Sequence, residues 1–334
     1  MKIVHLLPAM EQGGVETVVC DLVKALSHCE SLVISKGGRL VERIQSEGGR
    51  HIALNLKSKN PLTYFLRAWK LREVLRNEKP DLVCVHSRVP AWLFVWANRG
   101  LNLHWITYAH GANSVSRYSE IMTKGDLVIT PSRFLADYLK LHYGLSESKI
   151  RVIPHAIDAV RFDPERLDST FIAEKRQEWN IRDGRRVAMV IGRITPVKGL
   201  DNLIRTTPVE TKLIIVGGAD RHHRKYLDSL KALAGPNVIF AGPQTKIPEC
   251  LSIADEIISA NTTKPESFGL SVVEAYAMNK PVRVTRRFGG VAEVMEAVEK
   301  AGKPTLREAV LDLYGVSRWT ERTLLAYREV MNMV

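Results

Sequence analysis

The sequence predicts an α/β protein of two domains, each built on a parallel β-sheet with helices on both faces. At 334 residues the chain is longer than a single hydrophobic core usually grows. Short apolar runs alternate with helical segments along its length, which is the pattern of repeated strand–helix units. We expect one domain in residues 1–160 and a second in residues 161–315, followed by a helical segment in 316–334.

Composition narrows the class of protein without naming a ligand. The net charge is +12 and the isoelectric point about 9.6, which suits nucleic acid, an anionic membrane or a phosphorylated substrate. No apolar run is long enough to cross a membrane, and the first residues are too short for a signal peptide. The cysteines have no metal-ligand spacing, so we expect a cytoplasmic protein, soluble or peripheral, in a reducing compartment. These cysteines are Cys20, Cys29, Cys84 and Cys250.

The first predicted strand, Ile3–Leu7, leads through a loop into a helix from about Val15 to Leu26. Gly13 and Gly14 precede that helix, so its first amides are open to an anion. A dinucleotide-binding G-x-G-x-x-G pattern is absent, and a plain turn without a ligand is the alternative.

Further strands of the first domain are predicted from short apolar runs. They are Leu32–Ser35, Ile52–Leu54, Leu82–His86, Trp105–Tyr108, Leu127–Thr130 and Arg151–Ile153. Helices are expected at Pro61–Arg76 and Ser132–His142, the second with Ser132 as its N-cap. His110 directly follows a strand, where a histidine can be structural or can face a ligand.

Residues 57–79 are both basic and aromatic. An amphipathic helix of this kind can lie on an anionic membrane surface. The alternative is an ordinary surface helix whose aromatic side chains face the core. The basic residues are Lys57, Lys59, Arg67, Lys70, Arg72, Arg76 and Lys79, interleaved with Tyr64, Phe65, Leu66 and Trp69.

In the second domain the predicted strand Val187–Ile191 ends in a loop that carries Arg193 and Lys198. A guanidinium can grip phosphate with two hydrogen bonds, and an ammonium can act as a point charge. Such a pair can also be ordinary surface charge. Further strands are predicted at Leu213–Gly217, Asn237–Phe240 and Pro281–Thr285.

The most informative stretch lies between the apolar run 256–260 and a helix that begins at Gly269. The free amides at this helix start suit phosphate. Glu266 and Glu274 bracket them with seven residues between. Because carboxylates repel phosphate, we expect them to accept hydrogen bonds from hydroxyl groups of the same ligand. Amides that donate to phosphate, next to carboxylates that accept from hydroxyl groups, indicate a sugar nucleotide as the ligand.

Glu266 to Glu274 resembles the E-x7-E signature of the retaining GT-B glycosyltransferases of the glycosyl-group-1 family, also called family 4-like. Gly192-Arg193 with Lys198-Gly199 resembles that family's Gly-Arg…Lys-Gly motif, and Gly289-Gly290 with Glu293 resembles a later one. Residues 154–158 resemble the family's Pro-Asn-Gly-Ile-Asp connection, with His155-Ala156 replacing the usual pair. The resemblance spans nearly the whole chain. It implies a GT-B fold, two Rossmann-like domains facing each other across a cleft, with the last helix packing back on the N-terminal domain.

The resemblance also implies roles for particular residues. Arg193 and Lys198 would bind the donor diphosphate, Glu266 and His110 the transferred sugar, and Glu274 the ribose. The implied catalytic residues are Arg193, Lys198, Glu266 and His110. The implied donor-binding residues are Gly13, Gly14, Gln244, Ile247, Ser267, Phe268, Gly269, Leu270, Ser271 and Glu274.

The expected reaction moves a sugar from a nucleoside-diphosphate sugar to a hydroxyl of a glycan or lipid-linked acceptor. The positive side chains and amides would stabilise the leaving group's charge, so we expect neither a metal nor a cofactor. Relatives suggest lipopolysaccharide or surface polysaccharide synthesis, at the inner face of the plasma membrane. The nucleotide stays open between UDP, GDP and ADP.

Three other functions compete with this one. A GT-B-like sugar-nucleotide epimerase or phosphorylase would use the same donor site with a different acceptor. A nucleic-acid-binding protein would use the basic surface, although the chain has no recognisable nucleic-acid module and we expect no nucleic-acid partner.

Overall fold

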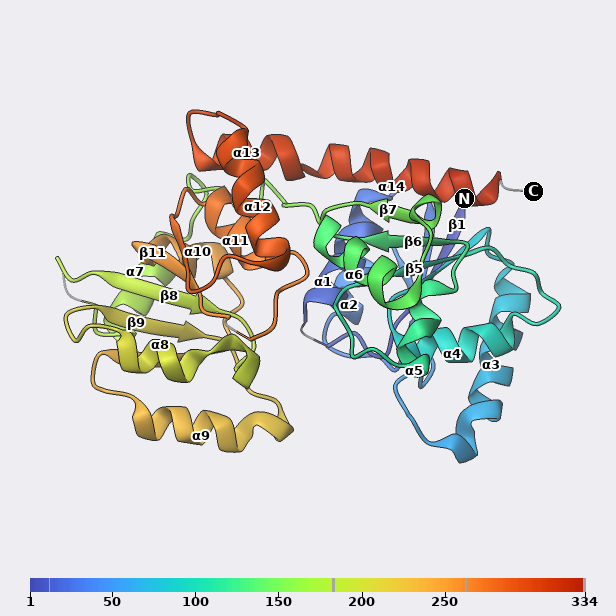
Figure 1. Cartoon of the computed structure of the whole chain (residues 1–334), viewed down its shortest axis with the longest axis horizontal. Coiled ribbons are helices and arrows are strands. Elements are labelled where there is room, and N and C mark those ends of the chain that lie inside the picture. Colours follow the sequence, from blue (N-terminus) through green and yellow to red (C-terminus); the bar gives the residue numbers. More distant parts are fainter. Residues whose placement is uncertain (12, 182–183, 262, 333–334) are drawn as a thin grey trace. The chain divides into compact units, whose positions relative to one another are not determined.

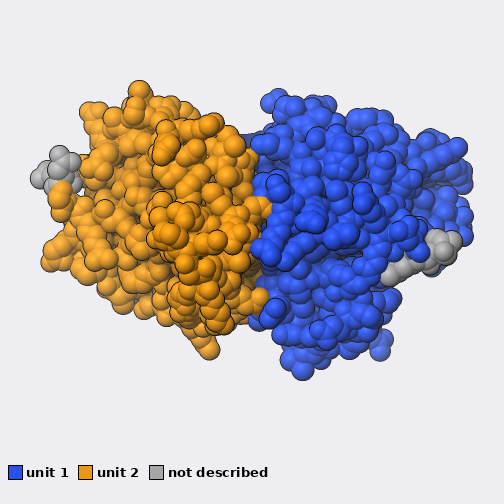
Figure 2. Space-filling model, turned by 90° about the horizontal axis from the view of Figure 1, so that it is seen from above, with its two compact units in different colours: residues 1–155, 316–334 blue, residues 156–315 orange. Residues whose placement is uncertain are grey.

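The computed structural model describes residues 1–11, 13–181, 184–261 and 263–332. Three residues of predicted segments, Arg182, Asp183 and Thr262, lie outside this part of the chain. The described chain divides into two compact units, coloured separately in Figure 2. Unit 1 comprises residues 1–155 and 316–334, and unit 2 comprises residues 156–315. The division therefore falls just before the predicted boundary at residues 160 and 161.

Unit 1 is built on a parallel sheet in the order β3-β2-β1-β4-β5-β6-β7 (Figure 1). Val, Ile and Leu dominate these strands because helices cover both faces of the sheet. The strands are β1 (Lys2–Leu6), β2 (Glu30–Ser35), β3 (Arg50–Ala53), β4 (Leu82–Val85), β5 (Trp105–Tyr108), β6 (Leu127–Thr130) and β7 (Ile150–Val152).

Helix α6 (Arg133–Tyr143) of unit 1 begins and ends at capping residues. The Ser132 hydroxyl accepts a hydrogen bond from the Leu135 amide at 3.2 Å, so its predicted N-cap role is confirmed. Gly144 ends the same helix in the left-handed conformation. The helices are α1 (Gly14–Ala25), α2 (Val41–Ser46), η1 (Pro61–Thr63), α3 (Tyr64–Glu78), α4 (Arg88–Ala97), α5 (Arg117–Glu120), η2 (Ile121–Thr123), α6 (Arg133–Tyr143), η3 (Glu147–Lys149) and α14 (Val316–Met331).

The last helix, α14, completes the core of unit 1. Trp319 and Tyr327 are buried, and the Tyr327 hydroxyl lies 2.7 Å from that of Tyr108 on β5. Glu329 forms an ion pair with Arg151 on β7. The helix is therefore tied to the sheet by both apolar packing and polar contacts.

The structure of residues 57–79 differs in two ways from the interpretation of this segment as a basic, aromatic helix. Phe65, Leu66 and Trp69 are more than half exposed, so the alternative in which the aromatic side chains face the core is wrong for Phe65 and Trp69. Arg67 is buried and donates to loop carbonyls such as that of Ser58, and Arg72 donates to the carbonyls of Ala97 and Arg99. These two guanidinium groups hold the helix in place and do not belong to a free basic face.

Unit 2 is built on a second parallel sheet, in the order β10-β9-β8-β11-β12. Its strands are β8 (Val187–Ile191), β9 (Lys212–Val216), β10 (Val238–Gly242), β11 (Glu256–Ser259) and β12 (Val282–Val284). Its helices are α7 (Ser169–Glu178), η4 (Pro196–Lys198), α8 (Leu200–Thr206), η5 (Arg221–His223), α9 (Arg224–Leu233), α10 (Ile247–Ile253), α11 (Leu270–Ala277), α12 (Gly289–Lys300) and α13 (Leu306–Tyr314).

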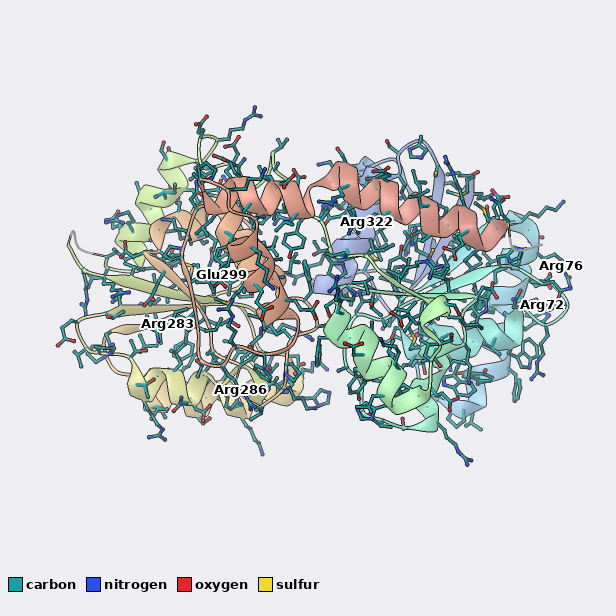
Figure 3. All side chains as sticks on the ribbon, turned by 45° about the horizontal axis from the view of Figure 1, so that its top comes forward. Arg72, Arg76, Arg283, Arg286, Glu299 and Arg322 are labelled. Atoms are coloured by element: carbon teal, nitrogen blue, oxygen red, sulfur yellow. The ribbon has the colours of Figure 1, made fainter. Side chains whose placement is uncertain are left out.

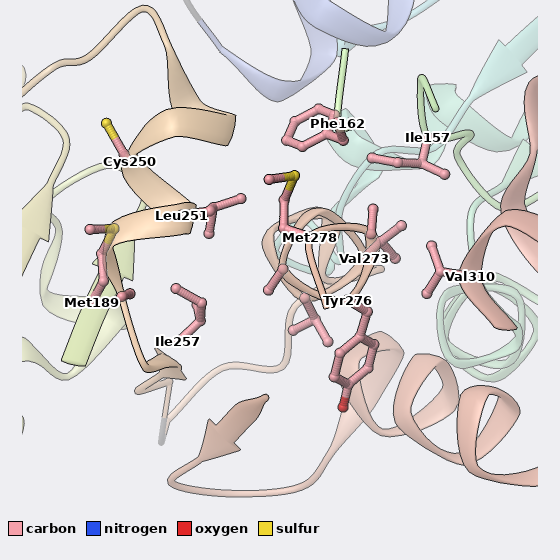
Figure 4. Packing of buried hydrophobic residues seen from close by; sticks show 14 of the residues in the cluster. Ile157, Phe162, Met189, Cys250, Leu251, Ile257, Val273, Tyr276, Met278 and Val310 are labelled. Carbon is pink, nitrogen blue, oxygen red and sulfur yellow. The ribbon is translucent and has the colours of Figure 1, made fainter. Parts of the chain in front are cut away.

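Helix α11 lies at the centre of the core of unit 2. Val273, Tyr276 and Met278 pack with Ile257 of β11 and Val310 of α13 (Figure 4). All of these side chains are less than a tenth exposed. Because α11 is held on several sides, the loop that leads into it has a fixed end.

Candidate functional site

The loops that follow β8 and β11 form the candidate site of unit 2. These strands are neighbours and parallel, so both loops leave from the same edge of the sheet. The strand order runs outward from β8 in one direction and from β11 in the other. In open parallel sheets the crevice at such a reversal, beyond the carboxyl ends of the strands, is the usual ligand site.

Lys198 and Glu266 meet at this reversal. Lys198 ends η4 in the loop after β8, Glu266 lies in the loop after β11, and their side chains form an ion pair. Both side chains are about one-fifth exposed, so the pair is partly shielded from water yet reachable. The backbone of Gly192 passes close to the lysine, since a Cβ atom there would be in ordinary contact with Lys198 Cε at 3.4 Å.

Arg193 lies beside this pair in the chain, on the loop after β8. Its side chain is exposed, and within the described residues its guanidinium has neither a hydrogen bond nor an ion pair. An uncommitted guanidinium next to an ammonium group gives this loop a concentrated positive charge.

The loop after β11 turns into α11 at Gly269. This glycine has φ of +89°, and a Cβ atom in its place would lie 2.7 Å from the Val291 side chain. Phe268 is buried and meets the Tyr314 ring edge-to-face at 5.4 Å between centroids. The turn is thus held between α12 and α13, and the free amides at the start of α11 follow it.

Gly289 and Gly290 fix the same loop from the start of α12. A side chain at Gly290 would collide with the Ser267 carbonyl oxygen, and one at Gly289 with Pro265. The Gly290 amide also donates to the Glu266 carbonyl at 2.8 Å. These glycines do more than permit a turn, since they allow α12 to press against the backbone that carries Glu266.

Gly217 is a residue whose role the sequence interpretation missed. It follows β9 with φ of +146°, and a Cβ atom there would overlap the Gly192 carbonyl oxygen. The Gly192 amide donates to Val216 and the Ile194 amide to Gly218, each at 2.9 Å. The signal for it in the sequence is the Gly-Gly pair that directly follows an apolar strand.

The remaining predicted residues of unit 2 take ordinary places in these loops. Glu274 lies half-buried in the second turn of α11, and Leu270 and Ser271 begin that helix. Ile247 begins α10. Gln244 lies in the loop between β10 and α10, and its side-chain amide donates to the Ala241 carbonyl at 2.6 Å.

In unit 1 the predicted loop residues lie at the same kind of sheet edge. Gly13 is the N-cap of α1 and Gly14 its first residue, with nothing within 4 Å of a Cβ atom at Gly14. His110 follows β5, and its Nε2 atom lies 3.0 Å from Nδ1 of His86. Its ring also stacks on that of His155, with centroids 5.8 Å apart.

Burial keeps these histidines neutral. It lowers the pKa of His110 to about 3 and that of His155 to about 4, with the mutual repulsion of the two rings adding to the effect on His110. The hydrogen-bond partner of His110 is another imidazole and not a carboxylate. Within the described part of the chain, His110 therefore has no acidic partner of the kind that a charge-relay base uses.

Two features are absent among the described residues. No group of three or more His, Cys, Asp or Glu side chains there is arranged to hold a metal ion. Among the helices formed by those residues, none has the length and apolar character needed to span a bilayer.

Comparison with known families identifies this architecture. Residues 12–161 match the family model described as Glycosyltransferase Family 4, and residues 171–302 match Glycosyl transferases group 1. The chain belongs to the group 1 glycosyl transferases. The first match covers the strands of unit 1 from β2 to β7, and the second covers strands β8 to β12 of unit 2 and the loops that carry Arg193, Lys198 and Glu266.

One curated relative and two solved structures are similar to this chain. A lipopolysaccharide 1,2-N-acetylglucosaminetransferase of Salmonella typhimurium is 26% identical over 70% of this chain; the match spans 62% of that protein, less than two-thirds of its length. A glycosyltransferase structure from Rickettsia africae has a TM-score of 0.84 at 24% identity, covering 100% of this chain and 99% of that one. Anabaena Alr3699/HepE in complex with UDP and glucose has a TM-score of 0.82 at 18% identity, covering 98% and 100%. The fold is GT-B, as the sequence motifs predicted.

Proposed function

We propose that this group 1 family member transfers a sugar from a nucleoside-diphosphate sugar to a hydroxyl of a glycan or lipid-linked acceptor. The observation that carries the proposal is the Lys198–Glu266 ion pair at the strand reversal of unit 2. Lys198 can bind phosphate and Glu266 can accept from hydroxyl groups, and the two side chains are in direct contact. This suits a sugar nucleotide, in which the diphosphate is bonded to the sugar.

The leaving group of this reaction is a nucleoside diphosphate, whose negative charge grows as the glycosidic bond breaks. Lys198, Arg193 and the free amides at the start of α11 would stabilise that charge. Three sources of positive potential support transfer without a divalent ion, so we propose that the reaction is metal-independent. They also favour the transition state over the intact donor, because they act most strongly on the developing charge.

The carboxylates and His110 are assigned to the sugar nucleotide's hydroxyl groups. Glu266 would accept hydrogen bonds from the transferred sugar, and Glu274 from the ribose. We assign His110 of unit 1 to a hydroxyl of the transferred sugar. Glu266, the carboxylate beside Lys198, is engaged with that cation, so we propose retention by a front-face route without an enzyme nucleophile.

Retention follows the family signature, and Glu266 is held by Lys198 in an ion pair, which makes the carboxylate a poorer nucleophile.

The acceptor class is proposed from the relatives. The Salmonella typhimurium protein is named for lipopolysaccharide, and the Anabaena structure contains UDP and glucose. We therefore place this protein in lipopolysaccharide or surface polysaccharide synthesis, and we propose a UDP-sugar as the first donor to test.

An exposed apolar stripe on unit 1 supports attachment to an anionic membrane. Leu62, Phe65, Leu66 and Trp69 recur at helical spacing along η1 and α3 and are between 51% and 90% exposed. Trp92 of α4 adds a partly exposed ring, which stacks on Tyr118 of α5 with centroids 6.4 Å apart.

Exposed basic residues flank this stripe along the chain. Lys57, Lys59, Lys70, Arg76 and Lys79 are all exposed, and Arg76 is labelled at the end of α3 in Figure 3. Apolar side chains that enter the headgroup region, with cations that attract anionic lipids, are the two components of interfacial binding. We propose that this surface holds the protein at the membrane that carries a lipid-linked acceptor.

Nucleotide binding tests the donor assignment directly. The melting temperature of the purified protein is measured with UDP, GDP and ADP, each with and without EDTA. We expect one nucleotide to raise it in both conditions, and the matching nucleotide sugar to release that nucleotide on incubation. Stabilisation that disappears with EDTA would contradict metal independence. If none of the three nucleotides stabilises the protein, the assignment of the donor site is wrong.

A further inference from the structure

Three histidines of unit 1 form a continuous hydrogen-bonded chain. His5 lies on β1, His86 directly follows β4, and His110 follows β5. These three strands are neighbours in the sheet, so the imidazole rings line up across its carboxyl edge. His5 Nδ1 lies 3.1 Å from His86 Nε2, and His86 Nδ1 lies 3.0 Å from His110 Nε2.

A chain of neutral imidazoles has a direction. Burial lowers the pKa of His5 to about 4 and that of His86 well below its usual value, so each ring carries one N–H and one lone pair. Both nitrogens of His86 are engaged, and one must donate while the other accepts. The tautomer of His86 therefore fixes the tautomers of His5 and His110 together.

The inner end of the chain favours one direction. His5 is fully buried, and its Nε2 atom has no hydrogen-bond partner among the residues that the structure describes. If the chain donated inward, this atom would carry an orphaned buried N–H, whereas outward donation leaves only a lone pair there. Orphaned buried N–H groups are the rarer defect in native proteins. With outward donation, Nδ1–H of His5 donates a hydrogen bond to Nε2 of His86, and Nδ1–H of His86 donates one to Nε2 of His110.

We propose that His86 and His5 are positioning residues that hold His110 as the Nδ1–H tautomer, so that it serves as a hydrogen-bond donor to a sugar oxygen of the ligand. The role of the ligand rests on the proposed function. In this state the Nε2 lone pair of His110 is occupied by His86. The ring can donate a hydrogen bond through Nδ1 but cannot act as a base.

Ring packing holds the orientation that this tautomer needs. His86 stacks on Tyr108 with centroids 4.7 Å apart, and His110 stacks on His86 and His155 at 5.3 and 5.8 Å. Elsewhere in the described chain, no side chain or backbone group accepts a hydrogen bond from Nδ1 of His110. That N–H is therefore available to a ligand.

Nitrogen NMR of protein labelled with ¹⁵N-histidine tests the tautomer without any ligand. Correlations between ring nitrogens and carbon-bound ring protons distinguish Nδ1–H from Nε2–H, and a His110→Asn variant assigns the signals. We expect His110 to be the Nδ1–H tautomer in the wild-type protein at pH 7. A wild-type His110 in the Nε2–H form would overturn the proposal, whether or not any variant folds.

Substitution of His86 tests the positioning role. His86→Phe keeps a ring in the stack but removes both hydrogen bonds, and we expect His110 to become a mixture of tautomers. His86→Asn restores one donor near Nδ1 and should return the wild-type signal. The exposed His28→Asn serves as the control, with no change expected. An unchanged His110 spectrum in His86→Phe would show that His86 does not set the tautomer.

Activity then links the tautomer to catalysis. We expect kcat for nucleotide release to fall about tenfold in His86→Phe with a smaller change in KM, and to recover in part in His86→Asn. A full rate in His86→Phe would overturn the role in catalysis. Failure of the donor assignment would show separately, as absence of nucleotide stabilisation in the wild-type protein.

Discussion

The side chains of Lys198 and Glu266 form an ion pair that joins the loop after β8 to the loop after β11. The two residues lie 68 positions apart in the sequence, and the contact exists because β8 and β11 are adjacent parallel strands. A phosphate that binds Lys198 must share the ammonium group with this carboxylate. The pair therefore couples recognition of the diphosphate to recognition of the sugar.

Replacement of Lys198 with Ala should lower turnover by about 10²–10³-fold, because it removes a preorganised positive charge from the leaving group. The melting temperature should change little, since the lysine is partly exposed. Initial rates of nucleotide release measure the effect, with Lys225→Ala on α9 as an exposed control. A rate within twofold of the wild type would remove Lys198 from the mechanism.

Replacement of Glu266 with Gln should separate binding from catalysis. The carboxylate repels the diphosphate, so its neutralisation should tighten binding of the free nucleoside diphosphate several-fold. Turnover should fall at least tenfold, because the sugar hydroxyls lose a charged acceptor. Calorimetric titration and initial rates measure the two effects. Weaker nucleotide binding in Glu266→Gln would contradict the assignment of this residue to the sugar.

Replacement of Gly290 with Ala should lower the free energy of unfolding of unit 2 by about 1–3 kcal/mol, because the new methyl group meets the Ser267 carbonyl oxygen. Urea denaturation measures this change. Gly14→Ala is the steric control for stability, since nothing lies within 4 Å of its Cβ position. Equal effects of the two substitutions would mean that α12 does not press against the Glu266 loop.

The buried histidines should make unit 1 sensitive to acid. Burial lowers the folded-state pKa of His5 to about 4, below the unfolded value of about 6.5. The unfolded chain then takes up protons that the folded chain does not, so stability is full above about pH 6.5 and is lost as the pH falls toward 4. For His5 alone the loss is on the order of 3 kcal/mol.

Urea denaturation between pH 7 and pH 4 measures this dependence. His86, His110 and His155 are shifted in the same direction and add to the slope. His5→Phe should make the slope shallower, while the exposed His28→Asn should leave it unchanged. A free energy of unfolding that stays constant over this range would contradict neutral burial of the cluster.

The double variant Phe65→Ser, Trp69→Ser should bind vesicles that contain anionic lipid at least tenfold more weakly, because it lacks the rings expected to enter the interface. Sedimentation with vesicles measures the bound fraction. Leu141→Ser on α6 is the control, as Leu141 is 78% exposed and lies outside the stripe. Equal binding by the double variant would exclude this surface as the membrane contact.

The sequence predicted the parts of the fold and site that depend on local order. The strand before Lys198, the helix after Gly269 and the Ser132 cap all follow from residues close together in the chain, and the structure has them. The family motifs then supplied the fold, because they mark the loops at the carboxyl ends of β8 and β11.

Contacts between non-consecutive strands could not be predicted in this way. His5 and His86 are 81 positions apart, and neither lies in a recognisable motif. Their bond depends on the pairing of β1 with β4, which the pattern of apolar residues does not specify. The sequence also could not show which face of α3 is buried, since the stripe that contains Phe65 and Trp69 has the helical spacing of a core face. In the structure Ala68, Leu71 and Leu75 take that place.

The return of the chain to unit 1 at residue 316 makes unit 2 an insertion within a discontinuous domain. During synthesis, residues 1–155 leave the ribosome long before α14 exists, and Tyr108 has no Tyr327 to cover it. Unit 2 is contiguous and can complete its core first. Maturation of unit 1 thus waits for α14 to be translated, and a chain truncated before α14 would keep an open apolar surface that chaperones and proteases recognise.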